Sequence, residues 1–408
     1  MIYQTNSKDQ TTKITIQVKA PNGTTYEVDK ITSFSLAFDI LNLGDPFSIT
    51  VPDPKKKWKN ILVPGQPLKV FASNPNVQNG AQVQMYDGLI VNRQRISDID
   101  RGSVIQLNCF DKGWYLLNNC PEVWQQITTG TYVDLFKKYA GDSTWGFVNA
   151  DGTLNLTTDA ATSRKIRQGL VTGRQGELQA AAVGGLLVYR IQTEPGMTNA
   201  SLLLKYAKNF GRLCNITPDG AFQVFTPDYA QNPSYRLDYH DDNQRVKNNV
   251  LNIRIQEKID SVYTNVTVVG ETVLNLTPNP DDPNTGKFRG YASNSRILPF
   301  THNLSYTEGE PYKSGYANVA AKWRLDRGLF DASTFIYRVR GHQQQGKFWT
   351  PDTMVQVNDT VNDVVQNLYL AFVRLERTPQ GDIAELHLKY PNLLVPVQIV
   401  PNTPTIAR

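Results

Sequence analysis

The sequence predicts a mainly β protein with α+β parts. Three observations support this fold class: a three-strand stretch that occurs twice, many segments in which apolar and polar residues alternate, and the composition. Hydrophobic residues make up 40% of the chain and charged residues 19%, and long Glu/Lys-rich helices are missing. With 408 residues the chain is too long for one ordinary core, so we expect about two to four domains.

The repeated stretch runs from Pro64 to Asp111 and again from Pro351 to Pro391. Each copy reads as a strand, a loop, a second strand, a turn and a third strand. The aligned positions, first copy then second, are Pro64 and Pro351, Leu68 and Val355, Val70 and Val357, Val91 and Val373, Arg95 and Arg377, Gln106 and Glu385, Leu107 and Leu386, and Cys109 and Leu388. A three-strand unit repeated far apart suggests a duplicated β domain, although any two meanders share part of this pattern.

The first β domain is expected over 1–121. Residues 14–18 alternate, the Pro21-Asn22-Gly23 turn follows, and 26–31 can return as a hairpin partner. Two further alternating segments place their large apolar residues on one face: Phe34, Leu36, Phe38, Phe47, Ile49 and Val51. A period of two with one apolar face predicts a sheet with one side on a core.

The segment PDPKKKWKN, which includes Lys55, Lys56, Lys57 and Trp58, predicts a cationic loop. A solvated loop is the ordinary interpretation, because charge runs usually face water. The alternative is a protein interface, because a tryptophan beside cations is an unusual side chain to expose to solvent. We name these four residues as candidates for a protein interface.

The middle section, 122–245, is expected to be α+β. One helix should be capped by Thr131 and end at Gly141, and a second should be capped by Asn199 and end at Gly211. A hairpin turned by Pro218-Asp219-Gly220 should follow.

A second β domain is expected over 246–394. It contains a helix that Ser314 can cap and Gly328 can end, and an exposed loop near Pro278–Gly286. The remaining residues, 395–408, are Pro-rich and predict an extended or disordered C-terminal arm.

The sequence contains no constellation of residues that indicates catalysis. The histidines stand alone in the sequence: His240, His302, His342 and His387. We therefore predict no catalytic, cofactor-binding or metal-binding residues and expect a protein that is not an enzyme. His387 should be exposed or packed in an interface.

Cysteines and basic residues add two expectations. Three cysteines give neither a disulfide framework nor a metal spacing, and Cys214 reads as a buried structural thiol. The segment Arg164–Gly169, together with Arg174, is a basic patch without interleaved aromatics, so it could contact an acidic protein partner or a phosphate backbone.

Charge and hydropathy bound the location of the protein. A net charge of +5 is mildly basic, and the lysines and arginines form no dense stripe of the kind that binds nucleic acids. The polar start lacks an apolar signal core, and no apolar run reaches membrane-spanning length. We expect a protein that is cytoplasmic at synthesis, or one exported by lysis or another route that needs no signal peptide.

The order of these parts resembles the baseplate hub proteins of contractile-tailed phages, the Mu-like hub or late-control family that includes tail protein D. Three pieces carry the resemblance: the P-G-x-P strand entry at Pro64–Pro67, the helix-Gly-hairpin at Leu202–Pro227, and the W-x-P-x-x-x-V-x-V entry at Trp349–Val357. The resemblance extends from about Phe34 to Pro391, and none of these motifs is a catalytic signature.

The resemblance implies two tube-like β-barrel domains per protomer and a homotrimer. Such a trimer would join a sixfold tail tube to a threefold central spike in the virion baseplate, after assembly in the host cytoplasm. Its partners would be the spike, the tail tube or a tube-terminal protein, and other baseplate proteins, with DNA only in transit through the lumen. The alternatives are another tail or secretion-tube component, such as a distal-tail or spike-type protein, and a tail-associated cell-wall hydrolase.

Overall fold

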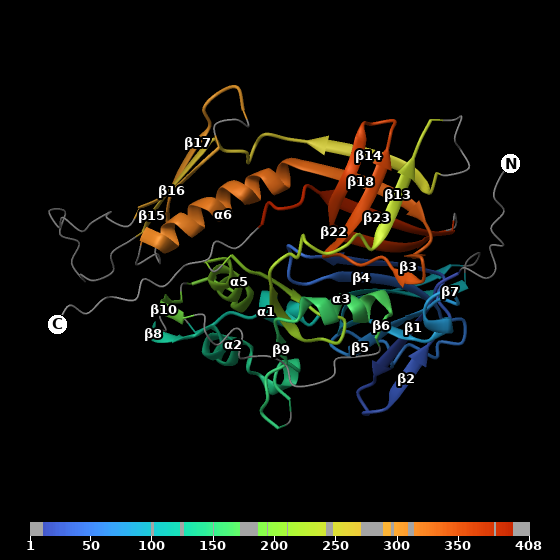
Figure 1. Cartoon of the computed structure of the whole chain (residues 1–408). Helices are drawn as coiled ribbons and strands as arrows, with labels where there is room; N and C mark the ends of the chain where they lie inside the picture. Colours follow the sequence, from blue (N-terminus) through green and yellow to red (C-terminus); the bar gives the residue numbers. More distant parts are fainter. Residues whose placement is uncertain are drawn as a thin grey trace.

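The computed structural model describes residues 11–98, 102–122, 126–149, 151–171, 187–193, 195–209, 211–241, 248–270, 289–294, 298–308, 314–378 and 381–394. Strands dominate these residues, which confirms the mainly β fold (Figure 1). The loop predicted near Pro278–Gly286, the C-terminal arm and Arg174 lie outside the described residues.

The first β module is formed by the N-terminal strands. Its elements are β1 (Lys13–Lys19), β2 (Thr25–Val28), β3 (Ser33–Asp39), β4 (Pro46–Pro52), β5 (Pro67–Ser73), the short 3-10 turn Gln78–Gly80, β6 (Val83–Asp98) and β7 (Gly102–Asp111). They pair antiparallel in the order β3-β4-β7-β6-β5-β1-β2. The apolar face predicted from the alternation is buried, as Phe38 and Val51 illustrate.

The second β module is formed by strands near the C-terminus. Its elements are β13 (Tyr235–Tyr239), β14 (Val250–Glu257), β18 (Ser333–Arg340), β19 (Gln343–Gln344), β20 (Lys347–Phe348), β21 (Thr353–Asp359), β22 (Val364–Thr378) and β23 (Gly381–Lys389). The main strands follow the order β14-β18-β23-β22-β21-β13. Strand β13 falls within the stretch predicted as the middle section, yet it pairs with β21 and so belongs to this module.

The predicted repeat corresponds to two meanders of the same construction. In each, a long second strand pairs with a short first strand and with the third strand. A β-bulge interrupts the pairing of the second strand with the third. The outer strands align as the sequence suggests, but the middle strand does not. The structure matches Val91 with Ala371 and Arg95 with Leu375, two residues away from the predicted alignment. A shift of two keeps every side chain on the same face, so apolar patterning alone could not detect it.

The two modules are joined into one 13-stranded sheet through β3 and the second half of β22. Figure 1 shows the second module, in yellow, orange and red, above the first, in blue and cyan. One continuous hydrophobic core underlies both modules. The modules are therefore neighbours along a single sheet, held edge to edge by backbone hydrogen bonds and by shared apolar packing.

The middle section packs against the first module as a small α+β unit. Its elements are α1 (Gly113–Asn118), β8 (Gln126–Thr131), α2 (Tyr132–Ala140), the 3-10 turn Ser143–Trp145, β9 (Leu156–Thr157), α3 (Ala160–Gln168), β10 (Leu187–Gln192), α5 (Asn199–Asn209), β11 (Leu213–Ile216) and β12 (Phe222–Phe225). The cap predicted at Thr131 is confirmed, as a reciprocal capping box with Asp134. The cap predicted at Asn199 is wrong: Thr198 and Ser201 cap α5 reciprocally, while the buried Asn199 amide donates to the Tyr139 carbonyl.

A long helix with a small sheet of its own is inserted between β14 and β18. It comprises β15 (Asn265–Gly270), β16 (Arg289–Ser293), β17 (Asn303–Glu308) and α6 (Ser314–Ala332). The predicted stop at Gly328 is wrong, because α6 continues past it. A Cβ at Gly328 would lie 1.9 Å from the Ser261 carbonyl oxygen, so this glycine permits a close approach of backbone to helix.

Candidate assembly interface

The seam between β3 and β22 shows how two modules of this chain bind each other. Leu36 lies opposite Leu375 and Phe38 opposite Val373, and all four side chains are buried. On the other face Ser35 donates to Glu376. The seam therefore combines backbone pairing with an apolar inner face and a polar outer face, as in a sheet with one side on a core.

Helix α3 ties the middle section to the second module through the predicted basic patch. The Arg164 guanidinium lies 2.5 Å from the Asp352 carboxylate and 3.4 Å from that of Asp228, and both Arg164 and Asp352 are largely buried. The acidic partner of Arg164 is thus part of the same chain. Burial raises the pKa of Asp352 to about 6 despite the opposing effect of Arg164.

Arg167, one turn further along α3, connects to the first module. Its guanidinium is buried 4.3 Å from the centroid of the Phe38 ring. Burial lowers its pKa, which the nearby carboxylates of Asp45 and Asp111 oppose. Those two carboxyls have raised pKa values, mainly because they are buried, and for Asp45 also because Asp111 repels its charge. Arg164 and Arg167 belong to the basic patch predicted to contact a partner or a phosphate backbone. Both instead make buried contacts with residues of the same chain.

The predicted cationic loop, PDPKKKWKN at 52–60, lies between β4 and β5 of the first module. Lys55, Lys56 and Lys57 are exposed, and the Lys57 ammonium lies 4.3 Å from the centroid of the Trp58 ring. Trp58 is half-buried and packs on the main core, so the premise of an exposed tryptophan is wrong. Arg93 on β6 donates to the carbonyl oxygens of Lys59 and Leu62, which places this loop beside the second half of β6. That these four residues form an interface stays a prediction.

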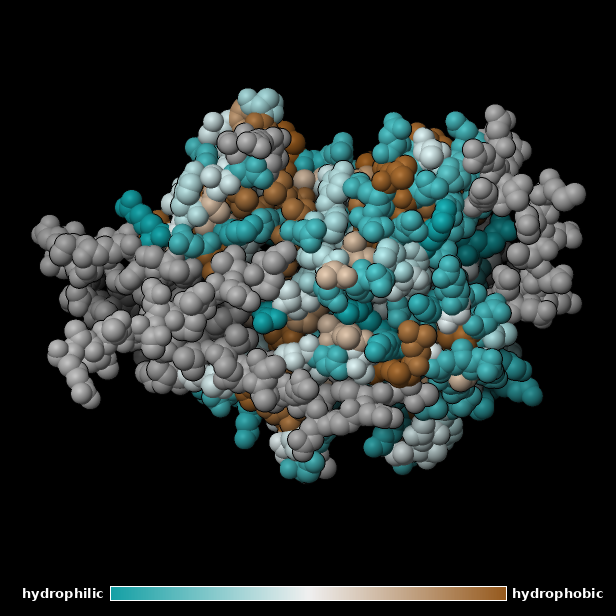
Figure 2. Space-filling model, in the orientation of Figure 1, coloured by the Kyte–Doolittle hydropathy of each residue, from teal (hydrophilic) through white to brown (hydrophobic). Residues whose placement is uncertain are grey.

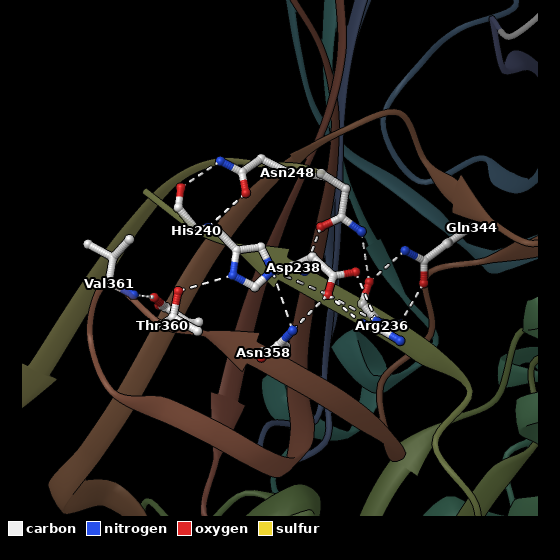
Figure 3. A network of polar contacts seen from close by, with 10 residues as sticks. Arg236, Asp238, His240, Asn248, Gln344, Asn358, Thr360 and Val361 are labelled. Atoms are coloured by element: carbon white, nitrogen blue, oxygen red, sulfur yellow. Dashed lines mark hydrogen bonds and ion pairs between the residues drawn. The ribbon is translucent and has the colours of Figure 1, made fainter. Parts of the chain in front are cut away.

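The outer edge of β13 is closed by side-chain amides instead of a strand (Figure 3). The Gln344 amide accepts from the Arg236 N–H and donates to its carbonyl, each at 2.7 Å. Asn249 accepts from the Asp238 N–H and donates to the Arg236 carbonyl, and Asn248 bonds the N–H and carbonyl of His240 in the same manner. Amides that occupy the strand's free hydrogen-bonding positions prevent another chain from pairing there.

The two edges that correspond to the strands of the β3–β22 seam carry no such closure among the described residues. Strand β14 pairs with β18 on one side alone, and residues 92–97 of β6 pair with β7 alone. On β14, Ile255 lies opposite the buried Phe335 of β18 and is 37% exposed, whereas Leu36 on β3, which has β22 as its outer neighbour, is fully buried. Figure 2 shows hydrophobic residues of the second module reaching the surface in small patches among hydrophilic ones.

The histidines lie apart from one another and contact structural neighbours. His342 is buried against Phe34, and burial lowers its pKa. His387 is half-buried beside the Phe372 ring, with its centroid 4.4 Å away, and so is packed against its own sheet. The described residues contain no group of His, Cys, Asp or Glu able to hold a metal ion.

The cysteines are free, and Cys214 is buried as predicted. Its thiol lies 3.6 Å from the Tyr132 hydroxyl, and burial raises its pKa to about 12. A thiol held neutral in this way suits packing and not nucleophilic chemistry. Within the part of the chain that is described, no helix is both long and apolar enough to cross a membrane.

No protein-family model matches this sequence, and no curated protein matches it. Among solved structures, the fold is similar to a tail protein from Neisseria meningitidis MC58, with a TM-score of 0.68 at 17% identity over 94% of this chain and 98% of that chain. It is also similar to the 43 kDa tail protein of prophage MuSo2 from Shewanella oneidensis, with a TM-score of 0.66 at 16% identity over 94% and 99% of the two chains.

A more distant likeness is to an E. coli component of the type VI secretion system, described as structurally similar to T4 bacteriophage tail proteins. The TM-score is 0.51 at 8% identity, over 91% of this chain and 77% of that chain. The chain therefore has the fold of these tail and secretion-system proteins, in which the paired β modules and the middle α+β section are all included in the match.

Proposed function

We propose that this chain is a structural hub of a phage tail baseplate. Three copies would form a ring that adapts the sixfold tail tube to the threefold central spike and becomes part of the DNA conduit. The observation that carries the proposal is the presence of two equivalent β modules in one chain, joined edge to edge through β3 and β22. Three such chains supply six modules, which match a sixfold tube on one side and a threefold spike on the other.

The structures that are similar to this chain support a role in a tail. Two are tail proteins, one of them from a prophage, and each aligns with this chain over nearly its whole length. The proposed partners are accordingly the spike, the tail tube or a tube-terminal protein, and other baseplate proteins. The proposed location is the virion baseplate, with assembly in the host cytoplasm.

The proposed mechanism is mechanical and not enzymatic. A continuous sheet resists deformation because adjacent strands share backbone hydrogen bonds along their whole length. The buried contacts of Arg164 and Arg167 fix the middle section to both modules, so the subunit can transmit force as one piece. Assembly would depend on large interfaces of complementary shape.

Native mass spectrometry of the purified protein tests this proposal. A hub should form a trimer, and the trimer should bind its spike protein in a complex of three subunits with one spike trimer. A ring of six copies would instead support a tube or distal-tail role, and a monomer at every concentration would contradict a ring-forming hub.

The second candidate is a component of a secretion tube. The likeness to the E. coli secretion protein favours it, as does a likeness to a chain of the Francisella PdpA–VgrG complex with a TM-score of 0.53 at 10% identity. This chain spans 59% of that Francisella chain. Mass spectrometry of purified phage particles separates the two candidates: a hub is present in virions, and a secretion component is absent from them.

A further inference from the structure

The two modules can be superposed strand by strand through their pairing registers. Strand β6 pairs with β7 in the same way as β22 pairs with β23. Strand β4 pairs with the other side of β7 and β3 with β4, just as β18 pairs with the other side of β23 and β14 with β18. The equivalent positions, first module then second, are Arg93 and Val373, Arg95 and Leu375, Phe47 and Phe335, Ile49 and Tyr337, Phe34 and Ile253, and Leu36 and Ile255.

This equivalence identifies two strand edges whose counterparts pair with each other inside one chain. Inside one chain, β3 of the first module pairs with the second half of β22. The counterpart of β3 in the second module is β14, and the counterpart of that half of β22 is residues 92–97 of β6. Neither has a strand partner on this side among the described residues, whereas the β13 edge is closed by amides.

We infer that β14 of one copy pairs antiparallel with residues 92–97 of β6 in a second copy of this chain. This inference rests on the proposed function, since it specifies how copies in the ring meet. The internal seam fixes the register: Phe372 pairs with Asp39 and Arg377 with Phe34. Transferred to the second seam, it places Gln256 opposite Gln94, Glu257 opposite Arg93, and Ile255 opposite Arg95.

The side chains at these places fit a contact between copies. Where the internal seam buries Val373 and Leu375, β6 carries Arg93 and Arg95. One nitrogen of Arg93 donates to the carbonyl oxygens of Lys59 and Leu62, and β14 places the carboxylate of Glu257 opposite this partly exposed guanidinium. Charged residues that point inward at an open edge discourage pairing with the wrong strand. An opposite charge on the correct strand removes that penalty and selects the register.

The contact is heterologous, because one copy contributes β14 and the other contributes β6. Such a contact closes into a ring when the rotation between neighbours divides a full turn, and otherwise continues as a filament. If the new seam repeats the geometry of the internal one, both kinds of junction impose equal rotations. The wall of the ring would then be one continuous sheet in which internal and inter-copy seams alternate.

Disulfide cross-linking tests the register directly. The exposed Cys120 is replaced by Ser, which leaves the buried Cys109 and Cys214. In that background Gln94→Cys with Gln256→Cys places two exposed positions opposite each other, at the roughly 4.5–5.5 Å Cα separation of paired strands, which a disulfide can span. The control is Asn92→Cys with Arg254→Cys, which uses the same strands and face but lies four residues out of register, about 13 Å apart.

On oxidation we expect the first variant to form covalent multimers and the control to stay largely as single chains. Cross-linking of the control, of both variants equally, or of neither in a preparation whose native mass is trimeric overturns the inference and leaves the hub proposal standing. In-register cross-links in a ring of six support the inference and contradict the trimer. A protein that is monomeric throughout contradicts both.

Discussion

At the scale of single residues, the charges that lie between sheet and helix are the groups that bear on stability. Asp45 and Asp111 both have pKa values raised above 3.8, so the folded state binds protons that the unfolded state releases. The stability they contribute is fully present below about pH 4 and is lost as the pH rises through their raised pKa values. The buried carboxyl pair therefore favours the folded state less at neutral pH than at mildly acidic pH.

We expect Asp45→Asn to flatten this dependence, because the variant lacks one of the two buried carboxyls whose pKa is raised. The loss of unfolding free energy between pH 4.5 and pH 7.5 should be smaller than in the parent protein, because the variant lacks one group that takes up a proton on folding. Urea unfolding at several pH values measures it. Asp29→Asn, which changes an exposed carboxylate, serves as the control. Equal pH slopes in parent and variant would refute this account of the pair.

The Arg164–Asp352 contact should be costly to break from one side. Arg164→Met leaves a buried carboxylate without its cation, and we expect a loss of about 3 kcal/mol in unfolding free energy. Adding Asp352→Asn should recover part of that loss, which a double-mutant cycle by urea unfolding detects. Lys13→Met, at an exposed ion pair with Asp29, should change stability by less than about 1 kcal/mol. Additive effects at Arg164 and Asp352 would show that they are not coupled.

At the scale of elements, helix α6 depends on one glycine. Gly328→Ala would normally strengthen a helix interior by about 1 kcal/mol. Here the added Cβ would lie 1.9 Å from the Ser261 carbonyl oxygen, so we expect a net loss of about 1–3 kcal/mol from the forced backbone shift. Thermal or urea unfolding measures it, with Lys165→Ala on the exposed side of helix α3 as a control. A stabilised Gly328→Ala variant would mean that α6 is not held this close to residue 261.

The closed edge of β13 gives a prediction for backbone dynamics. Asn249→Ala removes the acceptor of the Asp238 N–H, so hydrogen exchange at that amide should accelerate about fivefold to tenfold, as expected for the loss of one hydrogen bond. Exchange followed by mass spectrometry or NMR measures it, and Asn252→Ala on the exposed strand β14 should leave the Asp238 amide unchanged. Unaltered exchange in Asn249→Ala would show that the amide does not protect this edge.

The sequence predicted elements whose signals are local. Alternation located the strands that bury Phe38 and Val51, and Thr131 identified the start of α2. The sequence could not reveal that β13 joins the second module, because the pairing of β13 with β21 links residues more than a hundred positions apart. The same limit applies to the site. The residue types in Arg164–Gly169 do not show that its arginines face Asp352 and Asp45 of the same chain, and the cationic segment does not show that Trp58 packs on the core.

At the scale of the whole molecule, the seam between β3 and β22 suggests how a long chain can act as two adjacent pieces of a larger wall. The polar face of that seam includes Ser35 and Glu376, and the opposite face is buried in the core. Closed edges at β13 and open edges at β14 and β6 leave a limited set of ways for copies to meet. A ring is an arrangement in which the β14 edge and the β6 edge each find a partner.

Electron cryomicroscopy of the purified oligomer tests this arrangement most directly. The account predicts particles in which three copies surround a hollow centre, six β modules alternate around it, and β14 of each copy meets β6 of the next. Isolated single copies, or closed particles in which these two strands face solvent, would contradict it.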